Sequence, residues 1–221
     1  MEESAFQITF VGQAAPLAAE LEPLAESAVT ALKLTSDFSG LRICGDDLPG
    51  QDDVWYRLRP ARPKDTRPIL VLFCHGACFQ GSGRIADAVR PPRPVWEQMP
   101  APRDGMDLDP GDFSRERSAI FLHHHLLAAQ DMVRGRVRGR NLPAGLAEAF
   151  AEAWAVGLDG RLARKGLPGY PLAERRARFA RVFSPAGILL PDHWQVFQSL
   201  WDGALTGQKE ILDVVKRLPG L

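Results

Sequence analysis

Two neighbouring stretches decide the fold of this chain: Ser118-Ala-Ile-Phe-Leu-His-His-His-Leu-Leu-Ala-Ala-Gln-Asp131 and Leu142-Pro-Ala-Gly-Leu-Ala-Glu-Ala-Phe-Ala-Glu-Ala-Trp154. The first is apolar, carries three consecutive histidines and predicts a helix from about residue 114 to residue 134. The second predicts another helix, opened by Pro143. Glu148 and Glu152 are four residues apart, so they share one face of that second helix. Imidazoles and a carboxylate on two neighbouring helices are the ligands that a zinc site requires.

Outward from these stretches, strands are predicted before the histidines and helices after them. The clearest strand is the apolar run at 69–74, which Pro68 and a glycine-rich turn bound. A helix is predicted at 16–34, where Pro23 marks either a kink or the true start. The other predicted strands cover 6–11, 41–44 and 55–58, and the other predicted helices cover 85–89, 144–157, 171–183, 192–202 and 206–217.

This order of elements predicts an α+β fold. We expect a single domain over residues 1–221, in which a small N-terminal β-sheet with helices packs against a mostly helical C-terminal half. The α/β part covers residues 1–113 and the helical part covers residues 114–221. Residues 90–112 are rich in proline and predict an ordered, irregular loop, whose length favours a lid or a rim over a simple linker.

Composition restricts the class of protein. Apolar residues make up 45% and charged residues 24% of the 221 residues, which is typical of a globular protein. Lys+Arg and Asp+Glu both number 27, so no global charge favours nucleic acid or a membrane surface. No apolar run approaches the length of about 18 residues that a membrane span needs. The acidic N-terminus is unlike a signal peptide, so we expect a cytoplasmic protein with a protein or peptide partner and without nucleic acid or membrane.

The two helical stretches resemble the zincins, in particular the gluzincin-like metallopeptidases. That family carries His-Glu-x-x-His on one helix, and a second helix follows about two dozen residues later, often with a sequence like "LPxWLxEGxAEY". Here the stretch from His124 to Ala128 stands at the first motif, and 142–154 stands at the second. The resemblance covers about residues 40–160. It implies a zincin-like fold, zinc as the cofactor, His124 as the first zinc ligand and Glu148 as the third ligand.

The sequence departs from the family pattern at two positions. His125 stands where the resemblance requires the catalytic glutamate, and Ala128 stands where it requires the second histidine. Moving the motif by one residue in either direction restores neither group. A zinc-bound water needs a positioned base to attack a carbonyl carbon, and His125 is the candidate for that catalytic role. His125 nevertheless points about 100° around the helix from His124.

Three hypotheses follow from this partial match. The first is a degenerate metallopeptidase scaffold that lacks standard zinc hydrolysis and acts as a binding or regulatory protein. The second is a metal-dependent hydrolase with altered ligands, in which Asp131, two turns beyond His124, joins His124 and Glu148. His75 or His193 could also complete that site. The third is an unrelated fold in which the histidines are buried and hydrogen-bonded.

Other motifs carry weaker predictions. Cys74-His-Gly-Ala-Cys78 has half of the ligands of a zinc site, and reduced thiols at a strand end are favoured over a structural zinc. His75 and the glycines after it are similar to an α/β-hydrolase oxyanion loop, but the sequence has no G-x-S-x-G motif to supply the nucleophile. The arginines at 134–140 and in the helix at 171–183 could contact nucleic acid, although the neutral net charge argues against it.

Overall fold

The computed structural model describes residues 6–45, 54–60, 66–81, 112–139, 142–184 and 189–218. The predicted helix at 85–89 lies outside the described residues, as does the predicted proline-rich loop 90–112 apart from Asp112.

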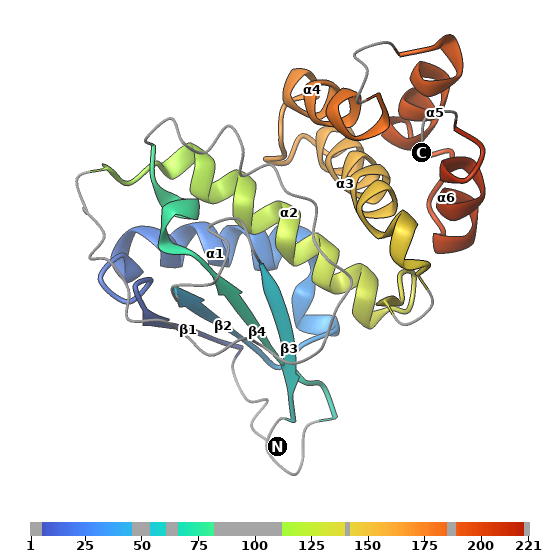
Figure 1. The fold of residues 1–221 in the computed structure, drawn as a ribbon. Coiled ribbons are helices and arrows are strands. Elements are labelled where there is room, and N and C mark those ends of the chain that lie inside the picture. Colours follow the sequence, from blue (N-terminus) through green and yellow to red (C-terminus); the bar gives the residue numbers. More distant parts are fainter. Residues whose placement is uncertain are drawn as a thin grey trace.

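A four-stranded sheet forms the N-terminal half, in the order β1-β2-β4-β3 (Figure 1). β1, β2 and β4 run parallel to one another, and β3 lies antiparallel to β4 at one edge. The apolar run of β4 occupies the interior of the sheet, as expected for a strand with a neighbour on each side. All four predicted strands are confirmed: β1 (Gln7–Gly12), β2 (Gly40–Gly45), β3 (Trp55–Arg59) and β4 (Ile69–Cys74).

Two helices, α1 (Ala18–Leu32) and α2 (Arg115–Val133), pack beside each other against one face of the sheet. Alternate residues of the strands, including Leu41, Ile43 and Leu72, join the same apolar core as these helices. Pro23 lies inside α1 and does not mark its start. Proline removes one backbone hydrogen bond from the helix, but the burial of the leucines and alanines on the inner face stabilises the helix on both sides of it.

The C-terminal half is a group of helices around α3 (Ala147–Arg164), which contacts α4 (Leu172–Phe183), α5 (Pro191–Trp201) and α6 (Gln208–Val215). α3 continues past the predicted end at residue 157. The glycine that permits its closest contact is Gly160, since a side chain there would overlap the Trp201 carbonyl group at the end of α5.

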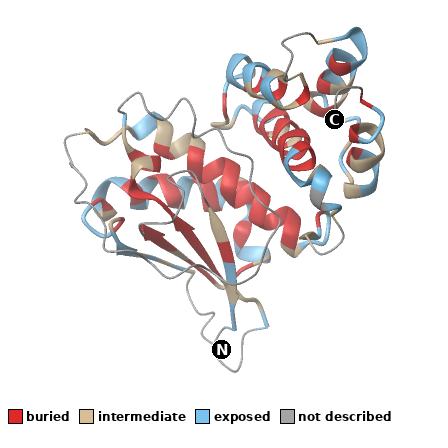
Figure 2. Cartoon of the chain, in the orientation of Figure 1, coloured by how far each residue is buried: buried red, intermediate tan, exposed pale blue. Residues whose placement is uncertain are grey.

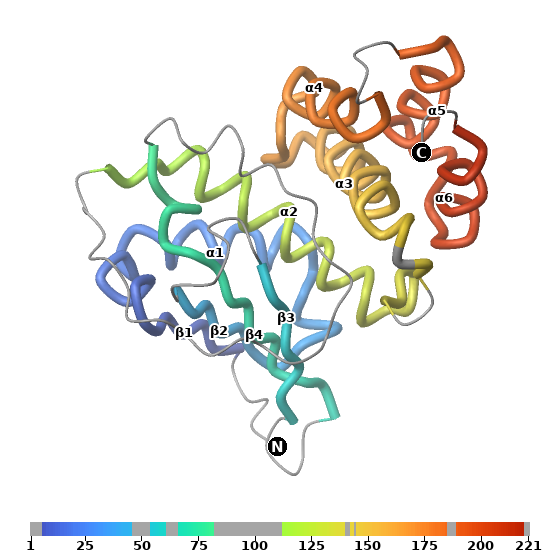
Figure 3. Tube along the Cα trace, viewed as in Figure 1, coloured from blue at the N-terminus to red at the C-terminus, as the bar shows by residue number. Residues whose placement is uncertain are grey.

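α2 connects the two halves, and the continuous Cα trace in Figure 3 shows it passing from the sheet toward α3. Every residue from Phe121 to Met132 is buried, because α2 packs on α1 on one side and on α3 on the other. Figure 2 shows the buried residues concentrated in the sheet interior, α2 and α3. The arrangement is α+β, as the sequence predicts. Within the described part of the chain, no helix combines the length and the apolar character that crossing a bilayer requires.

Candidate functional site: a buried polar cluster between α2, α3 and α4

The three consecutive histidines of α2 are all buried, and each has a different partner. His123 Nδ1 donates to the Ala119 carbonyl oxygen of its own helix at 2.8 Å. His125 Nδ1 is hydrogen-bonded to the Tyr56 hydroxyl of β3, also at 2.8 Å. His124 points the other way, toward α3. Successive side chains project about 100° apart around a helix, so three neighbours necessarily face three directions.

His124 lies at the centre of a buried polar cluster. Its Nδ1 is 2.7 Å from Asp159 Oδ1 of α3, and neither side chain has any exposed surface. The same carboxylate oxygen accepts the backbone N–H of Tyr170 at 3.1 Å. The Tyr170 ring packs edge-on against the imidazole. Asp159 therefore fixes both the orientation of His124 and the turn that leads into α4.

Arg175 of α4 completes this cluster and is also fully buried. Its Nε donates to Asp159 Oδ2, and its Nη2 lies 3.4 Å from His124 Nε2. Its guanidinium carbon stands 4.8 Å from the centre of the Tyr170 ring, in a cation–π contact. Glu152 Oε1 of α3 is 3.8 Å from Arg175 Nη1. One buried cation thus joins α2, α3 and α4.

These contacts define the protonation state of His124. Burial lowers the pKa of His124, while Asp159 opposes that shift. Burial also acts on Asp159, but Arg175 and His124 outweigh it and lower the pKa of the Asp159 carboxyl. Ionised Asp159 only accepts hydrogen bonds and Arg175 only donates them. The neutral imidazole with its proton on Nδ1 satisfies both partners, so both ring nitrogens of His124 are engaged.

Glu152 is the least satisfied member of the cluster. Its Oε2 accepts from Arg178 Nε at 3.4 Å, whereas its Oε1 has no hydrogen-bond donor among the described residues. Burial raises the pKa of Glu152 to about 7, despite the opposing effect of Arg175 and Arg178. This carboxyl group therefore exchanges a proton near neutral pH inside the fold.

The structure does not bring the predicted metal ligands together. The Glu148 side chain is 74% exposed and pairs with Arg178 at 3.6 Å. Asp131 is buried elsewhere on α2, where its carboxylate accepts from Arg161, Arg136 and Trp154. Only His124, of the three, belongs to the polar cluster. Across the described ranges, no three or more His, Cys, Asp and Glu side chains are grouped so that they could hold a metal ion.

The other sequence candidates lie in local turns. His75 Nδ1 accepts the backbone N–H of Ala77 at the start of the turn Gly76–Phe79, and His193 Nδ1 accepts that of Leu190 at the start of α5. The Cys74 thiol donates to the Cys44 carbonyl oxygen at 3.8 Å. Arg175, which the sequence grouped with surface arginines, is buried and offers no surface to nucleic acid.

Sequence reasoning missed Asp159 and Arg175. Asp159 stands among the apolar residues of α3, where a charged side chain is expected to have a buried partner. Arg175 lies four residues before Phe179 and eight before Phe183, both buried, on the inner stripe of α4. In both cases the sequence places a charged residue among the apolar positions of a helix, and that pattern could have predicted a buried ion pair.

Comparisons of the chain with protein-family models, with curated proteins and with solved structures found no match.

Proposed function

We propose that this chain is a zincin-like scaffold that lacks standard zinc hydrolysis and acts as a binding or regulatory protein. The contact between Arg175 and His124 carries the proposal. A zinc-binding histidine coordinates the metal through one ring nitrogen and usually donates its other N–H to a carboxylate or carbonyl. His124 makes the second of these contacts with Asp159, while Arg175 Nη2 lies 3.4 Å from Nε2, the atom that would bind the metal.

The donor set around His124 does not fit zinc. The position one turn after His124 is Ala128, which supplies no ligand, and Glu148 extends into solvent. The permanently charged guanidinium of Arg175 would also repel a divalent cation at His124 Nε2. A buried cation already balances Asp159, which is the charge that a metal ion would otherwise neutralise.

The residue in the position of the catalytic glutamate is equally unsuited to hydrolysis. Burial, together with the nearby His124 and Arg175, holds the pKa of His125 well below its usual value. The imidazole therefore remains neutral at physiological pH, and its Nδ1 is engaged with the Tyr56 hydroxyl. Hydrolysis requires a base within hydrogen-bond reach of a water molecule, and His125 packs against Phe121 in the core instead.

The test is elemental analysis of the chain purified without a nickel column or a chelator. The expected result is substoichiometric zinc, before and after incubation with excess zinc, and no peptidase activity that chelation abolishes. About one zinc per chain would overturn the proposal, and so would chelator-sensitive hydrolysis.

The competing hypothesis is a metal-dependent hydrolase that uses His124, Glu148 and a third group such as Asp131. It expects stoichiometric metal that is lost in both His124→Ala and Glu148→Ala. Glu148→Ala is the more decisive variant, because an exposed side chain can be removed without disturbing the core. Glu116→Ala, an exposed change in the first turn of α2, is the matched control.

A further inference from the structure

β1 is an open edge of the sheet. In the described part of the chain it pairs with β2 alone, and all its residues are exposed or partly exposed. An edge strand presents unpaired backbone N–H and C=O groups, which proteins commonly protect with charged residues or proline. β3 at the other edge carries Arg57 and Arg59, whereas β1 has the sequence Gln-Ile-Thr-Phe-Val-Gly and no such protection.

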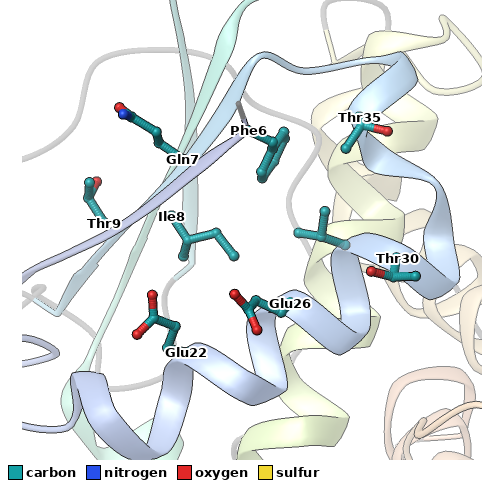
Figure 4. Close-up of a pocket in the computed structure, with 9 residues that line it drawn as sticks. Phe6, Gln7, Ile8, Thr9, Glu22, Glu26, Thr30 and Thr35 are labelled. Atoms are coloured by element: carbon teal, nitrogen blue, oxygen red, sulfur yellow. The ribbon is translucent and has the colours of Figure 1, made fainter. Parts of the chain in front are cut away.

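A groove of about 710 Å³ runs along this edge, between β1 and the outer stripe of α1. Figure 4 shows Phe6, just before the strand, and Ile8, within it, pointing toward the helix, and Glu22 and Glu26 pointing from the helix toward the strand. Val29 continues the helical side. The groove thus combines an apolar floor with two carboxylates beside an unpaired strand.

The carboxylates of the groove have no counter-charge among the described residues. Glu22 and Glu26 are both exposed, and neither has an ion pair or hydrogen bond to another described residue. No lysine or arginine is among the described residues that line the groove. Their positions four residues apart separate them by about 5–6 Å along α1. Alternate side chains on one face of an extended strand are about 6.7 Å apart. Two basic side chains of an added strand can therefore each reach one of the two carboxylates.

We propose that this groove binds an extended basic segment of a partner protein, which adds to the sheet as a strand beside β1. The backbone of the segment pairs with the open edge, as in other cases of strand addition. Every second side chain, arginine or lysine, enters the groove, where its aliphatic part covers Phe6 and Ile8 and its charged end meets Glu22 or Glu26. The proposal extends the binding role proposed above, but it does not depend on the cluster around Arg175.

The probe is a labelled, end-capped peptide of about eight alternating valine and arginine residues, long enough to span one strand. Fluorescence anisotropy should show saturable binding to the full chain that weakens as salt is added, because the ion pairs are exposed. The double variant Glu22→Gln/Glu26→Gln should bind about tenfold more weakly, the loss expected for two exposed ion pairs. Glu20→Gln, an exposed change on the same helix outside the groove, should bind like the wild type.

Two further peptides separate strand addition from simple charge attraction. A peptide with glutamate in place of arginine should fail to bind. The arginine peptide with N-methyl groups on alternate backbone nitrogens keeps its charge but loses the N–H groups that pair with β1, so it should bind at least about tenfold more weakly. Equal binding of the methylated peptide would overturn the proposal, as would unchanged affinity in the double variant.

Sedimentation of the chain alone completes the test. Self-association that the arginine peptide displaces would assign the groove to a second copy of this chain and overturn the peptide proposal. A chain that remains monomeric and binds the peptide supports it. Zinc content is independent of these measurements, so a failed peptide experiment and a failed metal experiment remain distinguishable.

Discussion

Glu152 is the residue at which the buried cluster is most sensitive to pH. Its carboxyl group has no exposed surface, faces Arg175 and Arg178, and leaves one oxygen without a hydrogen-bond donor among the described residues. The two arginines stabilise the ionised form, and burial disfavours it more strongly, so the pKa rises from 4.5 to about 7. The folded protein therefore retains this proton over a range in which the unfolded chain has released it.

This retention predicts the pH dependence of Glu152→Gln. Between pH 4.5 and about 7 the folded state binds more protons at Glu152 than the unfolded state does, so the contribution of Glu152 to the unfolding free energy falls as the pH rises. Glutamine resembles the protonated carboxyl and removes that dependence. The stability of the wild type relative to Glu152→Gln should fall by up to about 1.4 kcal/mol per pH unit in this range. Urea unfolding at several pH values measures it.

The lowered pKa values of the buried histidines His123 and His125 make the unfolding free energy rise with pH, which opposes the effect of Glu152. This contribution is the same in the wild type and in Glu152→Gln, so it cancels in the difference between their unfolding free energies. Glu148→Gln removes a carboxylate from the same helix at an exposed position beside the same Arg178, and it is the matched control. A difference between wild type and Glu152→Gln that is the same at pH 5 and pH 8 would contradict the assignment of the raised pKa to Glu152.

At the residue scale, the sequence predicted that His124 and Glu148 of the second helix would lie together, whereas the structure places a different acid of that helix beside His124. Glu148 and Glu152 were identified from a short motif, and the acid that reaches His124 is Asp159, two turns beyond Glu152. Residues about seven apart share a helix face, so the motif constrained the face of α3 but not the level at which α2 crosses it. The position along α3 at which α2 crosses it depends on the packing of whole helices, so a short motif cannot predict it.

At the scale of elements, the sequence predicted all four strands, because short apolar or alternating runs with clear breakers have few other interpretations. The predicted helix ended at Gly157, whereas α3 continues through Gly160 to Arg164. A glycine inside a helix can either end the helix or allow another element to pack closely against it. Gly160 has the second role, and the residue that it contacts, Trp201 of α5, lies more than thirty residues further along the chain, so the sequence around Gly160 does not show it.

The two glycines of α3 give a matched pair of predictions. An added Cβ at Gly160 would overlap the carbonyl group of Trp201, whereas at Gly157 it would lie 3.7 Å from the Leu200 carbonyl oxygen, an ordinary contact. Gly160→Ala should lower the unfolding free energy by about 1–3 kcal/mol, since the α3–α5 contact must open. Gly157→Ala should leave it unchanged or raise it by up to about 1 kcal/mol, because alanine favours the helix.

Thermal and urea unfolding of the two variants measure the difference. Equal effects of the two substitutions would mean that α3 and α5 are not in close contact at Gly160. Because both changes replace a glycine inside the same helix, the intrinsic preference of alanine for the helix cancels in the comparison.

At the scale of the whole molecule, the two halves share one core. A single apolar cluster extends from β4 through α1 and α2 to α3, α4 and α5, and the polar cluster around Arg175 joins α2 to α3 and α4. The sequence predicted a sheet followed by helices, and the arrangement is confirmed. It could not predict that a buried arginine would connect them, because Arg175 lies among other arginines in α4 and only the tertiary fold distinguishes it.

The shared core predicts that both halves unfold together, although chains of this length often unfold in steps. Separating α3 from α2 would expose the buried Trp154 and break the hydrogen bonds of His124 with Asp159 and of Trp154 with Asp131, so partial opening should be nearly as unfavourable as complete unfolding. Hydrogen exchange followed by mass spectrometry measures this directly. Amides of β4 and of the middle of α3 should exchange with the same free energy, within about 1 kcal/mol, and Arg175→Met should lower both equally. Faster exchange confined to α3–α6 in the wild type would mean instead that the helical half opens by itself and that the cluster around Arg175 stabilises only local contacts.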